Sequence, residues 1–327
     1  MYDQSYFSAE RYMREERDRK RIKLIGRVAG LCVIAYVVLQ NLLTLPIAFE
    51  PVRSWYFGSA VVQDIVTILL SVFGLMLPFA VGGLYLRRKT GTEVFAFDRP
   101  VSTKLMIFAV FFGFFVCLAG NYISSIFVSV MGDVGFKLTS PDYTVTDDLF
   151  GRIVYFVMVA VVPPLTEELA IRGVVMQPLR RYGDRFAIVA SAVIFAVLHG
   201  NLIQAPFALI AGIGIGYAVC ITGSLWTGVL IHFCNNAYSV LTEFMIRDIT
   251  DTARLNTAYN IVLGVLYAVS IIGSIIFVIL KAPRKLTPPA TTLSRRQKYG
   301  AFVLNIPMII AIGIMIYITS QYVSFAG

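Results

Sequence analysis

The stretch PPLTEELAIRG, residues 163–173, places two adjacent glutamates and an arginine inside an otherwise apolar segment. An ionisable side chain at the centre of a membrane helix costs about 2.5–3.5 kcal/mol to insert, so such groups are rare and most often functional. A glutamate pair at the membrane surface would simply face water. Because Glu168 lies well before Arg180, which marks the charged end of the segment, we expect the glutamate pair to lie deep in the segment instead.

The composition of the whole chain predicts that this segment crosses a membrane. Of the 327 residues, 57% are hydrophobic and only 14% are charged, and the mean hydropathy is +0.76. Soluble globular domains carry about 25% charged residues. Apolar runs long enough to span a bilayer recur along the chain. The expected fold class is therefore all-α, a polytopic membrane protein.

About nine membrane helices are predicted, at residues 28–49, 61–86, 104–131, 153–179, 186–203, 205–222, 225–245, 257–280 and 300–322. Lysine and arginine gather in the tail before the first segment and in three alternate connections, within residues 87–104, 180–185 and 281–298. Such loops stay on the cytoplasmic side. We therefore expect the N-terminus in the cytoplasm and the C-terminus outside.

The domain organisation expected is simple. Residues 1–24 are too polar for a cleaved signal peptide and are interpreted as a basic cytoplasmic tail, while residues 25–327 form a single membrane domain. The net charge of +9 is explained by topology and lipid headgroups, and no nucleic-acid partner is expected. The four cysteines lie in apolar segments without CxxC spacing, which argues against disulfides and thiolate metal sites.

Three polar groups are predicted to meet within the membrane domain. Glu168 and Arg172 are four residues apart and can pair on one helix face, whereas Glu167 points about 100° away. The only two histidines of the chain follow, His199 in FAVLHG and His232 in HFCNN. Helical rise puts all of them at a similar depth, near the middle of the bilayer. We expect them to line one cavity.

The two prolines before the glutamates are expected to break the helix. Proline has no N–H and clashes with the preceding turn, so Pro163 and Pro164 predict an interruption just ahead of Glu167. The hydroxyl of Thr166 could then cap the new helix or bond to the loosened backbone.

The chemistry that these residues suggest is peptide-bond hydrolysis. A carboxylate beside a neutral imidazole can hold a water molecule and take its proton during attack on a carbonyl. A second imidazole and the amide of Asn236, four residues after His232, could donate to the developing oxyanion. The same donor types suit zinc, but HExxH is absent, so a zinc ion is allowed and not required. No other cofactor is expected.

The three motifs together resemble the CPBP intramembrane protease family, which includes CAAX-processing and bacteriocin-immunity proteins. The family pattern of EExxxR, FxxxH and HxxxN is matched in order by Glu167-Glu168 with Arg172, Phe195 with His199, and His232 with Asn236. The resemblance covers about residues 150–245.

The resemblance implies a role for each matched residue. Glu167 would be the general base on water and His199 would share that water, while His232 and Asn236 would form the oxyanion hole. Glu168 and Arg172 would orient Glu167 or neutralise the site, and Phe195 would pack the substrate cavity. The substrate would be a peptide or protein at the bilayer, in some relatives a prenylated one cut after its lipidated cysteine.

Two alternatives from other classes remain open at this stage. A proton-coupled transporter could use the same acidic pair and histidines as a relay, although transporters usually show inverted repeats, which are not evident here. A non-proteolytic immunity or scaffold protein could keep the motifs without using them. In every case we expect a multi-pass integral membrane protein, and a bacterial plasma membrane by family habit.

Overall fold

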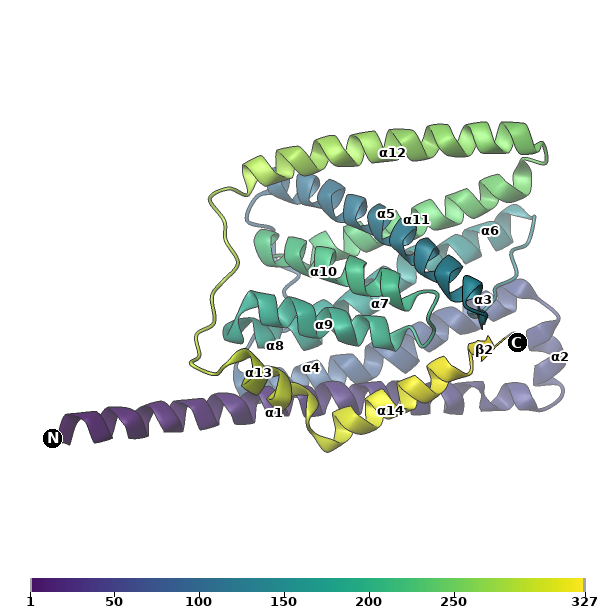
Figure 1. Cartoon of the computed structure of the whole chain (residues 1–327). Helices are drawn as coiled ribbons and strands as arrows, with labels where there is room; N and C mark the ends of the chain where they lie inside the picture. Colours follow the sequence, from purple (N-terminus) through teal and green to yellow (C-terminus); the bar gives the residue numbers. More distant parts are fainter. Residues whose placement is uncertain (1, 326–327) are drawn as a thin grey trace.

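The computed structural model describes residues 2–325 and shows a bundle of helices that run broadly along one direction (Figure 1). The first half of the chain contains α1 (Tyr2–Thr44), η1 (Leu45–Ala48), α2 (Val52–Phe57), α3 (Ala60–Leu69), η2 (Leu70–Met76), α4 (Leu77–Thr90), α5 (Thr103–Asp133) and β1 (Phe136–Leu138). The mostly helical, membrane-type fold predicted from composition is confirmed.

The second half starts with one long helical run that carries the two glutamates. It consists of α6 (Leu149–Phe156), η3 (Val157–Val161), α7 (Val162–Glu168), η4 (Leu169–Met176), α8 (Gln177–Leu179) and η5 (Arg180–Tyr182). The remaining elements are α9 (Asp184–Leu198), α10 (Ala205–Thr222), α11 (Leu225–Asp248), α12 (Thr252–Leu280), α13 (Arg295–Val303), α14 (Ile306–Ser320) and β2 (Val323–Phe325).

The helix carrying the glutamates does not break before Pro163, which corrects that expectation. The chain stays helical but widens into π geometry in η3, just before the prolines, and again in η4, just after Glu168. Thr166 fulfils the expected repair, since its hydroxyl donates to the carbonyls of Val162 and Pro163 at 3.2 and 3.3 Å. A π segment absorbs the missing donors without ending the helix.

The last predicted segment, residues 300–322, is not one straight helix. The chain bends by 75° between α13 and α14. Asn305 caps α14, because its side-chain oxygen accepts from the N–H of Met308 at 3.1 Å. Pro307 follows at the start of the new helix, where its missing N–H is harmless. A capping asparagine followed by proline therefore restarts the helix in a new direction.

Fewer helices meet the length and hydropathy expected of a membrane span than the nine crossings predicted. Six helical runs are long and apolar enough to cross a membrane, and the bent pair α13–α14 would make a seventh. Two of the predicted crossings coincide with α9 and α11, which lie outside this set. The helix α9 has only 15 residues, and α11 carries His232, two asparagines and several charges. Polar side chains lower the mean hydropathy of a helix, so a helix that carries site residues can fall outside a set defined by hydropathy.

The basic tail is a continuation of the first membrane helix. The helix α1 passes residues 24 and 25 without interruption, and Figure 1 shows its first part extending beyond one end of the bundle. The tail therefore projects along the helix axis instead of lying along the surface of the bundle.

The core that supports the site is built by α5, α9, α10 and α11. Helix α10 packs against α5 and α9, while α12 packs on the outer side of α5 (Figure 1). Many of the side chains of α12 are apolar and exposed, including Ile261, Val265 and Ile272. An exposed apolar surface on a peripheral helix is suited to contact with lipid.

Candidate active site

The two glutamates lie on α7, between the two π-helical segments η3 and η4. Glu168 is fully buried, whereas the side chain of Glu167 is 25% exposed. Adjacent residues on a helix diverge by about 100°, so the two carboxylates leave α7 in different directions. One carboxylate is therefore enclosed by protein, and the other borders open space.

The enclosed glutamate forms the predicted pair with arginine. The Nη1 atom of Arg172 donates to Oε1 of Glu168 at 2.8 Å, and both side chains are inaccessible to solvent. The guanidinium also donates to the carbonyl of Gly212 at 3.3 Å and lies 4.5 Å from the ring centroid of Phe195. Burial of an ion pair requires such extra partners to offset desolvation. Arg172 thus joins α10 and α9 to the glutamate helix.

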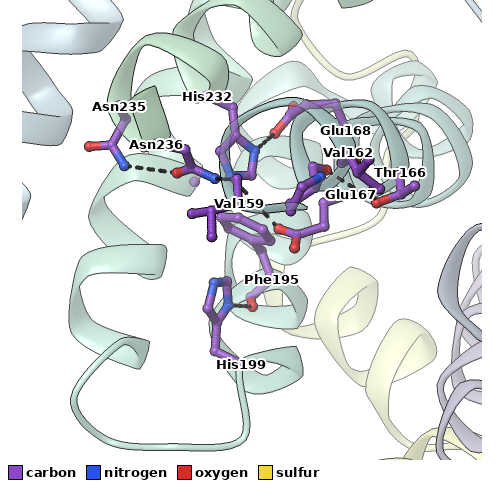
Figure 2. Close-up of polar contacts among 12 residues, drawn as sticks. Val159, Val162, Thr166, Glu167, Glu168, Phe195, His199, His232, Asn235 and Asn236 are labelled. Atoms are coloured by element: carbon purple, nitrogen blue, oxygen red, sulfur yellow. Dashed lines mark hydrogen bonds and ion pairs between the residues drawn. The ribbon is translucent and has the colours of Figure 1, made fainter. Parts of the chain in front are cut away.

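His232 of α11 lies between the two glutamates (Figure 2). Its Nδ1 atom is 3.1 Å from Oε1 of Glu168, and its Nε2 atom is 3.9 Å from Oε2 of Glu167. A carboxylate can only accept a hydrogen bond, so Nδ1 carries the hydrogen that it shares with Glu168. Nε2 is consequently directed at Glu167. Glu168 therefore contacts His232 directly.

His199 ends α9 and belongs to the same group of side chains. Its Nδ1 atom is 2.8 Å from the carbonyl oxygen of Phe195, one turn earlier. A carbonyl cannot donate, so Nδ1 carries the hydrogen and Nε2 keeps a free lone pair in the neutral ring. Figure 2 draws no contact from this second nitrogen, and Phe195 lies between His199 and His232.

Phe195 separates the two histidines as an apolar wall. Its ring meets His199 and His232 edge to face, with centroids 4.8 and 5.8 Å apart. The phenylalanine is 2% exposed. It therefore sets the spacing of both imidazoles and receives the guanidinium of Arg172 on its face.

Asn236 lies on the same side of α11 as His232, as its spacing predicted. Its Nδ2 atom donates to the carbonyl oxygen of Val159 at 2.8 Å, so part of its hydrogen-bonding capacity is used by the backbone of η3. A carboxamide has two N–H donors, and this bond occupies one of them. The other remains available to a ligand.

Two buried carboxylate oxygens lack a hydrogen-bond partner among the described residues. They are Oε2 of Glu167 and Oε2 of Glu168. Burial of an unpaired acceptor is unfavourable by about 1–3 kcal/mol or more when it is charged. Oε2 of Glu167 faces His232, on the side of the site where the Glu167 side chain is partly exposed. Such an acceptor is suited to a water molecule or a polar substrate atom.

Sequence reasoning missed three residues that shape the site. Gly228 lets α11 approach Glu168, since a Cβ at this position would lie 2.7 Å from its Oε2 atom. Asn235 donates to Asn236, and Asn121 donates to Asn235. An isolated asparagine in the apolar segment 104–131 was the available signal for Asn121, because polar groups in membrane helices usually find partners.

All four cysteines are free thiols, and Cys234 lines a separate apolar cavity of about 550 Å³ between α5, α11 and α12. Within residues 2–325, no three His, Cys, Asp or Glu side chains are grouped as metal ligands would be.

Comparison with known families identifies the segment that carries the site. Residues 149–238 match the family model described as Type II CAAX prenyl endopeptidase Rce1-like. No curated protein and no solved structure gives a significant match. The matched segment contains both glutamates, Arg172, both histidines and Asn236, and it lies within the region of the predicted CPBP resemblance. Residues 149–238 are therefore similar to the Type II CAAX prenyl endopeptidase Rce1-like family.

Proposed function

We propose that this protein is an intramembrane endopeptidase in which Glu167 activates the water molecule that attacks a peptide bond. One observation carries this proposal: Glu167 has a buried, unpaired oxygen directed at an imidazole nitrogen 3.9 Å away, at the half-exposed side of the site. A general base must have a free lone pair within reach of water and of a group that stabilises the proton. No other carboxylate in the matched segment combines these properties among the described residues.

The first step is proton removal from water. The free Nε2 atom of His199 accepts a hydrogen bond from one O–H of the water molecule, and the carboxylate of Glu167 removes the proton of the other O–H as the oxygen attacks the scissile carbonyl. The new C–O bond forms while the carbonyl π electrons move onto oxygen. Nε2 of His232 lies 3.9 Å from Oε2 of Glu167, so passage of the proton between them requires a bridging water molecule. Glu168 and Arg172 keep His232 in the required orientation by fixing the hydrogen on Nδ1.

The second step is stabilisation and collapse of the tetrahedral intermediate. The free N–H of Asn236 and, once protonated, Nε2–H of His232 donate to the oxyanion, as expected of an oxyanion hole. The C–N bond then breaks as the carbonyl reforms, and the proton passes from Glu167 or His232 to the leaving amine. Atoms and charge balance without a covalent intermediate or a metal ion.

The substrate and cellular setting extend this proposal. The proposed substrate is a protein or peptide with a prenylated cysteine near its C-terminus, which would enter from the lipid bilayer; a role in bacteriocin immunity is a further family-based possibility. The proposed topology has nine crossings with the N-terminus in the cytoplasm, which requires α9 and α11 to enter the bilayer. The proposed location is a bacterial plasma membrane.

The experiment is a cleavage assay with purified protein in detergent micelles. The probe is an internally quenched peptide with a farnesylated cysteine followed by three residues. Glu167→Gln is expected to lower turnover by about 10²–10⁴-fold, the usual contribution of a general base, and His199→Ala should also lower it strongly. Glu93→Gln is the matched control, because this glutamate pairs with Arg87 at the bundle surface, and it should leave turnover unchanged.

The controls separate the alternatives. Thermal unfolding of both site variants should remain cooperative, so that loss of turnover reflects chemistry. The zinc chelator 1,10-phenanthroline should leave the wild-type rate unchanged, and inhibition would reveal a metal enzyme instead. Retained turnover in Glu167→Gln removes this residue as the base. Absence of cleavage of both farnesylated and unmodified peptides by the wild type would overturn the protease assignment for this chain.

A further inference from the structure

The carbonyl of Val159 has lost its ordinary backbone donors. In an α-helix this oxygen would accept from the N–H of residue 163, and in a π-helix from that of residue 164. Both positions are proline, which has no N–H. The carbonyl lies in η3, inside the matched segment, where an unpaired backbone acceptor is costly.

A side chain from another helix supplies the missing donor. Nδ2 of Asn236 donates to this carbonyl oxygen at 2.8 Å. Oδ1 of Asn236 in turn accepts from Nδ2 of Asn235 at 3.2 Å, and Oδ1 of Asn235 accepts from Nδ2 of Asn121 on α5 at 3.2 Å. Three carboxamides thus connect α5 to the proline-containing turn of the glutamate helix, and Figure 2 shows the end of this series at Asn235 and Asn236.

The carbonyl of Val159 determines which group donates and which accepts in each of these hydrogen bonds. A backbone carbonyl can only accept, so Asn236 must present its NH₂ group to Val159 and its oxygen to Asn235. Asn235 must then donate, and its own oxygen must accept from Asn121. None of the three amides can flip alone without placing two donors or two acceptors against each other. The amide of Asn236 is therefore held in one orientation.

We propose that Asn121 and Asn235 are positioning residues that hold the second N–H of Asn236 toward the oxyanion, with the Pro163–Pro164 pair creating the acceptor that anchors the series. This inference rests on the proposed function, since it assigns the free N–H of Asn236 to the transition state. It adds Asn121, which lies outside the EExxxR, FxxxH and HxxxN motifs, and Asn235, which occupies an unspecified position within HxxxN. It also gives the proline pair a specific task, namely presenting an acceptor that the helix itself cannot satisfy.

The kinetic test is a double-mutant cycle between Asn121 and Asn236, assayed with the quenched farnesylated peptide. Asn121→Leu should lower kcat about 2–12-fold, the kinetic equivalent of one hydrogen bond, and leave KM unchanged. Asn236→Ala should lower kcat about 10²–10³-fold. In the Asn236→Ala background, Asn121→Leu should cause no further loss. An equal loss in both backgrounds would show that Asn121 acts independently of Asn236 and would overturn the proposal.

A matched control separates positioning from simple packing. Asn305 is also a buried asparagine, 4% exposed, but it caps α14 away from the site. Asn305→Ala should lower the melting temperature without changing kcat of the folded protein. If it lowers kcat as Asn121→Leu does, the effect reflects loosened structure in general and not the amide series.

A second cycle tests the same series without any activity measurement. Asn236→Ala should lower the melting temperature by about 2–6 °C, because it leaves the Val159 carbonyl unpaired. In a Pro163→Ala/Pro164→Ala background, a backbone N–H can bond to this carbonyl, and Asn236→Ala should then have a markedly smaller effect. An equal decrease in melting temperature in both backgrounds would contradict the proposed link between the prolines and Asn236. Failure of the peptide assay alone would instead count against the proposed function.

Discussion

At the scale of single residues, the site depends on how one imidazole is shared. Glu167 and Glu168 diverge on α7, yet both face His232, one at each ring nitrogen. The enclosed carboxylate is paired with Arg172 and fixes the ring, while the other is left without a hydrogen-bond donor. Adjacent glutamates can thus have different roles because their surroundings differ.

Gly228 provides a sharp test of this arrangement. A Cβ at this position would lie 2.7 Å from Oε2 of Glu168 and 3.1 Å from a methyl carbon of Ile215. Glu168 cannot move away without losing its bonds to Arg172 and His232. Gly228→Ala should therefore destabilise the protein by about 1–3 kcal/mol and lower turnover about 10–100-fold. Thermal unfolding and the peptide assay measure the two effects.

Gly264 is the matched control for that substitution. It lies in α12, and a Cβ there would meet nothing within 4 Å. Alanine has the higher helix propensity, so Gly264→Ala should leave turnover unchanged and the melting temperature equal or slightly higher. If Gly228→Ala behaves like Gly264→Ala, the close approach of α11 to Glu168 is not needed for the site.

At the scale of elements, α6 and α11 are tied together beyond the site. Arg152 of α6 makes a two-pronged ion pair with Asp248, the last residue of α11, with N–O distances of 2.7 and 2.5 Å. Hydrogen bonds from Arg152 lower the pKa of the Asp248 carboxyl below its ordinary value. Helix α6 begins the helical run that carries the glutamates, and α11 carries His232, so this ion pair helps to hold the elements of the candidate site in register.

The lowered pKa predicts a specific loss of stability in acid. A depressed pKa in the folded state means that the contribution is complete above the unfolded value of about 3.9 and is lost as the pH falls through the folded value. The melting temperature of the wild type should therefore decrease as the pH is lowered below about 4. Asp248→Asn should lower the melting temperature at neutral pH and reduce this acid dependence. Asp133→Asn, at an exposed position, should leave the dependence as in the wild type, and an identical slope in Asp248→Asn would contradict the assignment.

At the scale of the whole molecule, charge and helix direction agree. Figure 1 shows the two chain ends at opposite ends of the bundle, and the connections after α4 and α12 lie at the same end as the N-terminus. These connections carry the lysine and arginine residues that predicted a cytoplasmic side. The pairing of β1 with β2 closes the opposite end, where the C-terminus lies.

The proposed topology can be tested with single cysteines and a membrane-impermeant maleimide in intact cells. Asp142→Cys and Thr250→Cys should be labelled from outside, because both lie in connections at the end opposite the N-terminus. Thr92→Cys and Thr292→Cys should react only after permeabilisation. Labelling of Thr92→Cys in intact cells would reverse the orientation. Protection of Thr250→Cys would mean that α11 does not cross, and the count of nine would fail.

The sequence by itself determined the helical membrane fold, the approximate limits of most segments and the motif residues. Those features follow from local properties: runs of apolar side chains must be shielded from water, and residues four apart share a helix face. The Glu168–Arg172 pair was predictable for that reason.

Only the tertiary structure decided which groups meet. The position of His232 between two carboxylates and the amide series from Asn121 to Val159 depend on helices far apart in sequence. Helix propensity and hydropathy do not specify how one helix is rotated against another. Close packing sets that rotation, and with it which of two adjacent glutamates is enclosed and which faces the open side.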